Sequence, residues 1–355
     1  MSPSALHMLA FSLRNPYSLS FDRDGPFPVL YRLLRTKCTP TEEIDVTGFE
    51  NKTILITGVT SGCGLRCAKA FARVACHLIV TARNREKGED AVRQIIDSLE
   101  PSPCTAKVDL LELEMTSERS ISAFKYKLSK YASLDVAILN AGVYQPEFTI
   151  CPETGQEETI QVNFLSNCAI ALLAIPSLLR SHDQGRLLLI SSEAYAWANP
   201  KQHTFSMLLK QLGDPDAYTS YERYHISKLL VVLWVQQLAT RLDQNELLVA
   251  CASPGFSRSS LFRSFNSSKI AQFLEDMVCR SPDEGASQYI MAAKGLDDHT
   301  NGAFFSDGRF RELATAAISE AATGLCDSVW DGVLGILPMC VQAVAQDLLI
   351  PFSTQ

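Results

Sequence analysis

Short apolar runs alternate along this chain with longer segments in which apolar residues recur at helical spacing. Each short run is apolar on both faces, as expected for strands in a sheet that is covered on both sides. The segment with Leu65, Ala68 and Phe71 shows the intervening helical spacing. The candidate strands are residues 53–56, 78–81, 105–108, 136–139, 187–190, 247–250 and 303–305. This alternation predicts an α/β fold with one doubly wound parallel sheet, helices on both faces, and ligands beyond the carboxyl ends of the strands.

The two ends of the chain differ from this middle region. Residues 1–50 are rich in Pro, Ser, Arg and Asp, and we expect an N-terminal extension that packs on the domain or extends from it. Residues 51–355 are expected to form a single domain. Residues 6–13 lack the basic flank and cleavage site of a secretory signal. Residues 333–345 contain Pro338 and are shorter than the roughly 20 residues that span a bilayer, so we expect no transmembrane segment.

Composition narrows the classes of function. Of the 355 residues, 46% are hydrophobic and 20% are charged; the net charge is -7 and Lys and Arg are scattered, so no nucleic-acid surface is indicated. The 11 cysteines are an odd number, and only Cys63 and Cys67 lie close together. This pattern favours free thiols in a reducing compartment over disulfides or a metal site, and predicts a cytoplasmic protein. The sequence is also compatible with a homo-oligomer.

A glycine-rich turn follows the first candidate strand and leads directly into a helical pattern. Glycine suits a sharp turn, a close approach of backbone to a pyrophosphate, and tight packing of helix on sheet. The helix N-terminus would then present N–H groups to the phosphates. The alternative is a glycine turn that binds nothing. The candidate cofactor contacts in this turn are Thr57, Gly58, Ser61, Gly62, Cys63 and Gly64.

The end of the second candidate strand bears on the choice between NAD and NADP. An NAD site usually has Asp or Glu there, to accept hydrogen bonds from the ribose hydroxyls. This chain has Ala82 in that place and Arg83 after it. A guanidinium can pair with a 2′-phosphate in bidentate fashion. The strand end therefore favours NADP(H), and an exposed arginine without a ligand is the alternative.

Candidate catalytic residues lie on a later helix and strand. Tyr224 and Lys228 are four residues apart, so on a helix they share one face. A nearby ammonium would lower the pKa of the Tyr224 phenol from its usual value of about 10 toward one useful for acid–base chemistry. Of the two serines that end a buried strand, we expect Ser192 to bond a substrate carbonyl and Ser191 to cap the next turn. Asn163 lies in an apolar helical pattern and needs a polar partner.

Together these motifs resemble the short-chain dehydrogenase/reductase family over about residues 52–307, in the family's order. The resemblance implies a Rossmann-type fold. It implies a catalytic tetrad of Asn163, Ser192, Tyr224 and Lys228. In that tetrad Lys228 also holds the nicotinamide ribose and, through a water kept by Asn163, supplies protons to Tyr224. The further cofactor contacts implied are Asp109, placed after the third strand beside the adenine, Asn140, Ala141, Gly142, Pro254, Gly255 and Ser259.

Several features depart from the common family pattern. Cys63 stands where Ile or Leu is usual, and Ser259 stands where Thr is frequent. The stretch between Ser192 and Tyr224 is long, and it resembles the branch with retinol dehydrogenases and the oxidoreductase domain of WW-domain proteins. The N-terminal extension and the region of Trp330 resemble fungal members associated with secondary metabolism.

The resemblance implies an oxidoreductase that interconverts a carbonyl and an alcohol on a small molecule, and the strand end at Arg83 favours NADP(H) as its cofactor. Segments of about residues 195–221 and 256–285 should cover the pocket. Their apolar residues favour a medium-sized apolar substrate such as a polyketide, terpenoid, steroid or retinoid; these residues are Trp197, Phe205, Met207, Leu208, Phe262, Phe265 and Phe273. One alternative is a catalytically silent NADP-binding scaffold or sensor, which would be expected to lack one of the catalytic residues. Another is a sugar-nucleotide epimerase or dehydratase, which usually has a differently spaced glycine turn.

Overall fold

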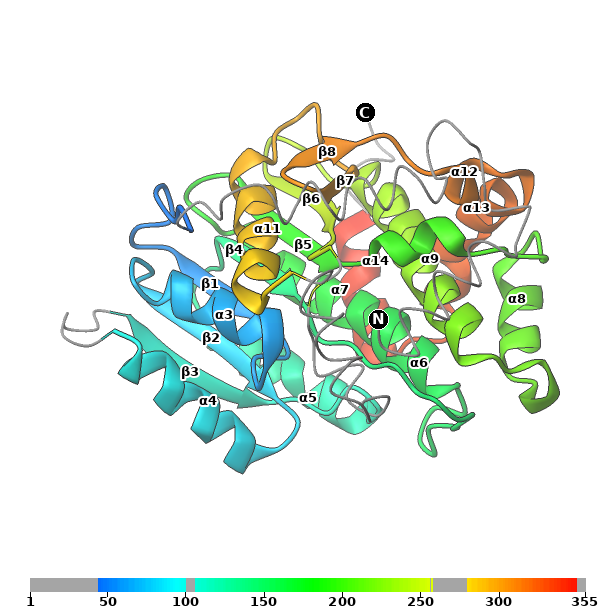
Figure 1. Cartoon of the computed structure of the whole chain (residues 1–355), viewed down its shortest axis with the longest axis horizontal. Coiled ribbons are helices and arrows are strands. Elements are labelled where there is room, and N and C mark those ends of the chain that lie inside the picture. Colours follow the sequence, from blue (N-terminus) through cyan, green and yellow to red (C-terminus); the bar gives the residue numbers. More distant parts are fainter. Residues whose placement is uncertain (1–43, 100–105, 256, 258–279, 350–355) are drawn as a thin grey trace, which may run out of the picture.

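A single sheet of eight strands organises the chain in the computed structural model, which describes residues 44–99, 106–255, 257 and 280–349 (Figure 1). The strand order is β3-β2-β1-β4-β5-β6-β7-β8. The strands are β1 Thr53–Ile56, β2 His77–Ala82, β3 Lys107–Glu112, β4 Val136–Leu139, β5 Gly185–Ile190, β6 Leu247–Ala252, β7 Phe304–Ser306 and β8 Arg309–Arg311. All neighbouring pairs are parallel except β7 and β8. The predicted doubly wound parallel sheet is confirmed.

The order of the strands places a crevice at the centre of the sheet. From β1 the chain moves outward to β2 and β3, and then returns to β4 on the other side of β1. Where the order reverses in this way, the connections leave toward opposite faces, and ligands bind beyond the carboxyl ends of the strands.

Two sequence predictions about strands were wrong. The third strand begins at Lys107, two residues later than predicted, and runs to Glu112, so Asp109 lies within the strand and not after it. The side chains of β3 are exposed or only partly buried, so its sequence lacks the continuous apolar run of a fully buried strand. The antiparallel β8 was missed, although Asp307 and Gly308 give the turn its signature. Both have positive φ, 49° and 75°, as a type I′ hairpin turn requires.

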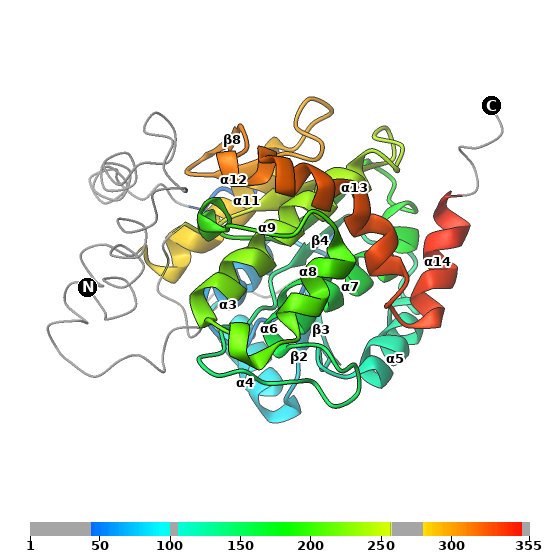
Figure 2. The ribbon, with the colours of Figure 1, turned by 90° about the vertical axis from the view of Figure 1, so that its right-hand side faces the viewer.

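Helices cover both faces of the sheet. One face carries α3 Gly62–Phe71, α4 Arg85–Asp97 and α11 Pro282–Gly295, and the other carries α5 Glu118–Leu128, α7 Ser166–Leu178 and α9 Ser220–Ala239 (Figure 1). Shorter helical elements lie in the connections: α6 Glu158–Ile160, the π-helical η1 Gln161–Leu165, η2 Glu193–Trp197, α8 Phe205–Leu212, η3 Pro215–Ala217 and α12 Thr315–Ile318. Two C-terminal helices, α13 Glu320–Leu334 and α14 Met339–Leu349, pack outside α9 and α7 (Figure 2).

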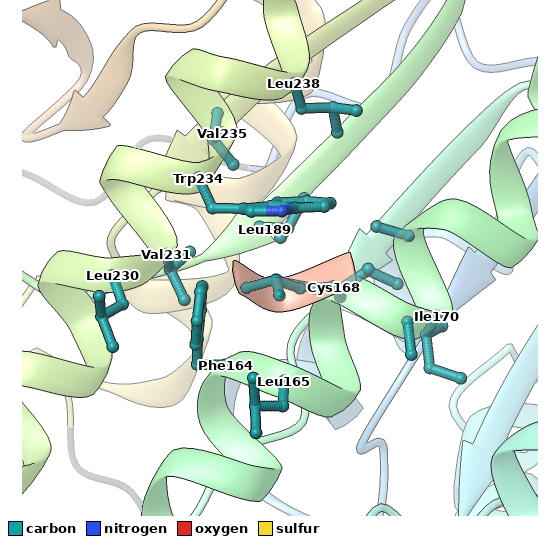
Figure 3. Packing of buried hydrophobic residues seen from close by; sticks show 14 of the residues in the cluster. Phe164, Leu165, Cys168, Ile170, Leu189, Leu230, Val231, Trp234, Val235 and Leu238 are labelled. Atoms are coloured by element: carbon teal, nitrogen blue, oxygen red, sulfur yellow. The ribbon is translucent and has the colours of Figure 1, made fainter. Parts of the chain in front are cut away.

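The larger of the two hydrophobic clusters that the described residues form lies between the sheet and α7 and α9. Trp234 of α9 packs there with Leu189 of β5 and Cys168 of α7 (Figure 3). On its outer side, the Trp234 ring stacks on Trp330 of α13, with centroids 5.7 Å apart and an interplanar angle of 17°. The smaller cluster lies on the face covered by α3 and α11.

The two ends of the described chain also differ from the expected pattern. Near the C-terminus, the apolar residues 333–345 do not form one continuous helix: α13 ends at Leu334, Pro338 precedes α14, and the chain bends by 118° between the two helices. At the other end Phe49 is buried against Phe71, so the last residues of the expected extension are part of the domain. Residues 1–43 lie outside the described structure.

Within the described residues, one continuous helical stretch is long and apolar enough to span a membrane by length and composition. It comprises α6, η1 and α7, Glu158–Leu178, and 94% of its most apolar window is buried inside the protein. The bent pair of α13 and α14 passes the same test only if both are counted as one span. The burial of Glu158–Leu178 is typical of a core helix that is covered by further helices.

Candidate active site

A cavity of about 780 Å³ lies along the carboxyl edge of the sheet, at the crevice between β1 and β4. It extends from the end of β2 to the turn after β6. The predicted site residues that line it are Gly58, Ser61, Gly62, Cys63, Gly64, Arg83, Asn140, Ala141, Gly142, Ser192, Tyr224, Lys228, Pro254 and Gly255. Thr57 and Asn163 are buried behind this lining. Ser259 lies outside the described residues.

The glycine-rich turn has the geometry of a phosphate cradle. Gly58 and Gly62 adopt positive φ of 72° and 61°, and α3 begins at Gly62. At Gly64 a Cβ would lie 2.4 Å from Nδ2 of Asn140 and 2.5 Å from the carbonyl oxygen of Gly58, so only glycine fits. The turn therefore packs tightly on Gly58 and Asn140 and leads directly into the N-terminus of α3, the arrangement that suits a pyrophosphate.

Asn140 joins this turn to the end of β4. Its Nδ2 donates to the carbonyl oxygens of Thr57 and Gly58, both at 3.0 Å. The hydroxyl of Thr57 accepts from the backbone N–H of Ala141 at 3.0 Å. Tyr289 of α11, which sequence analysis missed, donates to Oδ1 of Asn140 at 3.0 Å and lines the cavity. These bonds fix the floor of the crevice.

Cys63 takes a packing position in this turn. Its side chain is 6% exposed, and a Cβ added to Gly285 would lie 2.5 Å from its Sγ atom, so the thiol packs directly against this glycine. Burial raises the pKa of the thiol to about 11, so the group stays neutral at neutral pH. The eight cysteines in the described ranges are all free thiols, and those ranges contain no cluster of three potential metal ligands.

The end of the cavity beside β2 is lined by two cations, Arg83 and Lys87, and by the acid Asp90. Strand β2 and the three residues that follow it carry no acid. Lys87 was missed because it lies in the first turn of α4, where its side-chain direction depends on the helix packing. Ala82 is buried against Gly88: a Cβ added to Gly88 would lie 3.0 Å from the Cβ of Ala82.

The placement of Asp109 corrects the prediction that it follows the third strand. Its carboxylate is bonded to Nε2 of His77 at 2.8 Å and accepts from the Tyr131 hydroxyl at 3.0 Å. It does not line the cavity. Residues 113–116 do so instead, among them Glu114, whose carboxylate accepts from the backbone N–H of Thr116 at 3.0 Å. Because β3 ends at Glu112 and not at Val108, the residues that follow it and line the cavity come later in the sequence than predicted.

Tyr224 and Ser192 meet at the centre of the cavity wall. Ser192 is the second residue after β5, and its hydroxyl is hydrogen-bonded to that of Tyr224. Burial raises the pKa of Tyr224 to about 12, and the bond to Ser192 opposes the shift. The expected lowering of this pKa by Lys228 is therefore wrong. The desolvation of the buried phenol exceeds any gain from the ammonium.

Lys228 lies one helical turn from Tyr224 and is 5% exposed. Its Nζ donates to the carbonyl oxygen of Ile190 at 3.0 Å and lies 5.6 Å from the centroid of the Tyr224 ring. Burial lowers the pKa of Lys228 to about 8. Ser191 caps no turn, contrary to expectation: its hydroxyl donates to the main-chain oxygen of Lys228 at 2.8 Å.

Asn163 lies in the π-helical turn η1 and is fully buried. Its Oδ1 accepts from the backbone N–H of Val143 at 2.7 Å, and its Nδ2 donates to the carbonyl oxygen of Val143 at 2.9 Å. A Cβ at Gly142 would lie 3.1 Å from Oδ1 of Asn163 and 3.6 Å from Nζ of Lys228. Gly142 therefore lies where these two side chains converge. π-helical turns of this kind recur at functional sites.

Only part of the segment predicted to cover the pocket lies at the cavity. Trp197 lines it, but Phe205 and Leu208 are buried in the core and Met207 is 56% exposed. Helix α8 packs against α13 instead. Its Phe205 ring contacts that of Phe164 in η1, with centroids 5.8 Å apart, and lies where a Cβ added to Gly332 of α13 would approach to 2.4 Å. Phe262, Phe265 and Phe273 lie outside the described residues. The segment after β4 supplies the missed lining residues Val143, Tyr144 and Gln145.

Comparison with known proteins agrees with this geometry. A profile described as short chain dehydrogenase matches residues 52–206. The short chain dehydrogenase opdN of Penicillium oxalicum is 33% identical over 282 residues, which cover 74% of this chain and 89% of opdN. The chain belongs to the short-chain dehydrogenase family. Its members are oxidoreductases that bind nicotinamide cofactors, so this short-chain dehydrogenase is an oxidoreductase and its cradle fits a dinucleotide.

Two further similarities extend over more of this short-chain dehydrogenase. The short chain dehydrogenase resG of Aspergillus sclerotiorum is 30% identical over 349 residues, which cover 92% of this chain and 94% of resG. A solved structure of an uncharacterised protein from Mycobacterium paratuberculosis superposes with a TM-score of 0.60 at 23% identity, covering 88% and 98% of the two chains. The first match is fungal, as the sequence resemblance implied, and the second supports the fold.

The cradle generates a test that needs no substrate. We expect Gly64→Ala to weaken binding of both NADPH and NADH at least about tenfold, because the new methyl displaces Asn140 or the Gly58 carbonyl. Gly213→Ala is the matched control, since its Cβ would meet nothing closer than 3.5 Å. Fluorescence titration measures both, beside a thermal unfolding curve. Unchanged affinity in Gly64→Ala would contradict the cradle.

Proposed function

We propose that this short-chain dehydrogenase is an NADPH-dependent enzyme that interconverts a carbonyl and an alcohol, with Tyr224 as the acid–base residue. The observation that carries the proposal is the hydrogen bond between Tyr224 and Ser192 on the wall of the dinucleotide cavity, beside the ammonium of Lys228. A substrate oxygen placed at this point would contact both hydroxyls.

The proposed roles follow from the protonation states. A bound nicotinamide supplies or accepts the hydride, while the protein handles the proton and the orientation. In reduction, the neutral phenol of Tyr224 donates its proton to the carbonyl oxygen, and Ser192 donates a second hydrogen bond to that oxygen. The Lys228 ammonium stabilises the phenolate that results and bonds the nicotinamide ribose. Oxidation is the reverse.

Asn163 and the turn after β6 complete the proposed machinery. Asn163 holds Val143 and hence the cavity wall, and it retains a proposed role in keeping a water beside Lys228. Pro254 and Gly255 would lie against the nicotinamide, with Ser259 as a proposed carboxamide contact.

The proposed substrate is a medium-sized apolar ketone or aldehyde, such as a polyketide, terpenoid, steroid or retinoid-like compound. Val143, Tyr144 and Trp197 give the cavity an apolar wall near Tyr224, and the Tyr144 and Tyr224 ring centroids are 5.8 Å apart. The fungal relatives support a role in secondary metabolism. A cytoplasmic location remains part of this proposal.

The decisive experiment measures NADPH consumption with a panel of such carbonyls. We expect Tyr224→Phe to lower kcat at least about a hundredfold, because a positioned proton donor contributes about 10²–10⁴-fold, with NADPH affinity unchanged. Tyr221→Phe, three residues earlier on α9, is the matched control and should retain activity. A Tyr224→Phe enzyme with more than about a tenth of wild-type kcat would refute Tyr224 as the acid. A wild type that binds NADPH but reduces nothing would favour the silent scaffold.

The shifted pKa values generate a pH prediction. Tyr224, with its pKa raised to about 12, stays protonated across the working range, whereas Lys228, lowered to about 8, carries its charge only below that pH. The reducing form with both protons therefore decreases as pH rises through about 8. We expect kcat/KM for NADPH, which reports the free enzyme, to be constant near pH 6–7 and to fall above about 8. A value that stays constant beyond about pH 9.5 would contradict this assignment.

The cofactor choice is tested at the adenosine end. A charge-assisted contact contributes about 1.5–3 kcal/mol, so we expect Arg83→Ala to weaken NADPH binding about ten- to a hundredfold and to leave NADH nearly unchanged. Lys87→Ala should act in the same direction. Arg85→Ala is the control, because Arg85 bonds Glu89 on the exposed face of α4 and does not line the cavity. Equal wild-type affinity for NADH and NADPH would show that the preference is absent.

A further inference from the structure

The hairpin turn between β7 and β8 contacts two segments of the active site. Ser306 ends β7 and pairs with Arg309, and Asp307 and Gly308 form the two-residue turn between them. The backbone N–H of Gly308 donates to Oε1 of Gln288 on α11 at 2.8 Å, which fixes the turn against the domain. From this turn the side chain of Ser306 bonds Glu193, and that of Asp307 bonds two arginines.

Asp307 accepts from two arginines. Its Oδ1 accepts from Nη2 of Arg280 at 2.5 Å, and its Oδ2 accepts from Nη2 of Arg311 at 2.9 Å. The Arg280 side chain is 8% exposed and that of Asp307 is 18% exposed. An ion pair with so little solvent contact is screened weakly and holds its partners in one geometry.

Arg280 carries this constraint to the turn after β6. Its Nη1 donates to the carbonyl oxygen of Pro254 at 3.5 Å. Gly255 has a φ of +72°, and a Cβ there would lie 2.6 Å from the same Nη1 atom, so the guanidinium lies directly against this glycine. Arg280 also forms an isolated parallel bridge with Ser257, whose hydroxyl donates to the Pro254 carbonyl at 2.8 Å. Pro254 and Gly255 both line the dinucleotide cavity.

Ser306 makes the second connection. Its hydroxyl donates to Oε1 of Glu193 at 2.5 Å, and Glu193 directly follows Ser192. Ser306 is fully buried at the end of β7. The same turn therefore contacts the segment that carries Ser192 and, through Arg280, the segment that carries Pro254.

We propose that Arg280 and Asp307 are positioning residues that set the Pro254–Gly255 turn for the nicotinamide half of the cofactor. This rests on the proposed function, since it assigns that turn to the nicotinamide. Neither side chain lines the cavity, so both act through Pro254 and Gly255. The adenosine half, held near Arg83 at the far end of the cavity, does not depend on them.

The test compares a whole cofactor with one of its halves. Adenosine 2′,5′-bisphosphate carries the 2′-phosphate and adenine of NADPH but lacks the nicotinamide. We expect Arg280→Gln to weaken NADPH binding about tenfold and to change binding of the bisphosphate less than about twofold. Asp307→Asn should act in the same direction, and Arg280→Lys should restore part of the loss. Arg311→Gln is the matched control: it removes an ion pair from the same carboxylate without touching Pro254.

Each outcome decides the proposal. Selective loss of NADPH affinity in Arg280→Gln and Asp307→Asn, with Arg311→Gln near wild type, supports it. Equal weakening of both ligands would indicate a general loss of structure and would overturn it, as would unchanged NADPH affinity or an equal effect of Arg311→Gln. If Arg280→Gln does not fold, Asp307→Asn and Arg280→Lys give the same comparison. A wild type that binds no nicotinamide cofactor overturns the proposed function as well, whereas a wild type that binds NADPH leaves only the positioning role at stake.

Discussion

Lys228 makes two hydrogen bonds to the end of strand β5, and the arrangement of the active site depends on them. Its ammonium donates to the carbonyl oxygen of Ile190, and its own carbonyl oxygen accepts from the hydroxyl of Ser191. The side chain and the main chain of one residue thus join helix to strand at a single point. Because Ser192 follows on the strand side and Tyr224 lies one turn away on the helix, their hydroxyls meet.

Burial of this junction sets the protonation of both titratable groups. Desolvation disfavours the charged form of each side chain, so it raises the pKa of Tyr224 to about 12 and lowers that of Lys228 to about 8. Desolvation therefore keeps the proton on Tyr224, whereas Lys228 keeps its proton near neutral pH because its lowered pKa of about 8 is still above 7. A phenol in this state suits proton donation to a carbonyl, while a charged cofactor would shift the balance toward the phenolate.

The C-terminal helices make such burial feasible. Helices α7 and α9 pack on the sheet with one face and on α14 and α13 with the other, so they are apolar on nearly all sides. The stacked pair of Trp234 and Trp330 lies at the centre of this second contact. Lys228 is 5% exposed and lines the cavity, where it would meet the ribose of the proposed cofactor.

The sequence alone determined the elements whose signals are local. Alternating apolar runs predicted the sheet, glycine spacing predicted the cradle at Gly64, and four-residue spacing predicted that Tyr224 and Lys228 share one face. Tertiary structure decided what depends on the end of an element or on distant packing. Asp109 lies inside β3 because a half-buried edge strand has a weak apolar pattern, and α8 packs on α13 although its residues suited a pocket. The ion pair of Arg280 and Asp307 joins residues 27 apart, and the pKa of Tyr224 follows from desolvation, which no local pattern encodes.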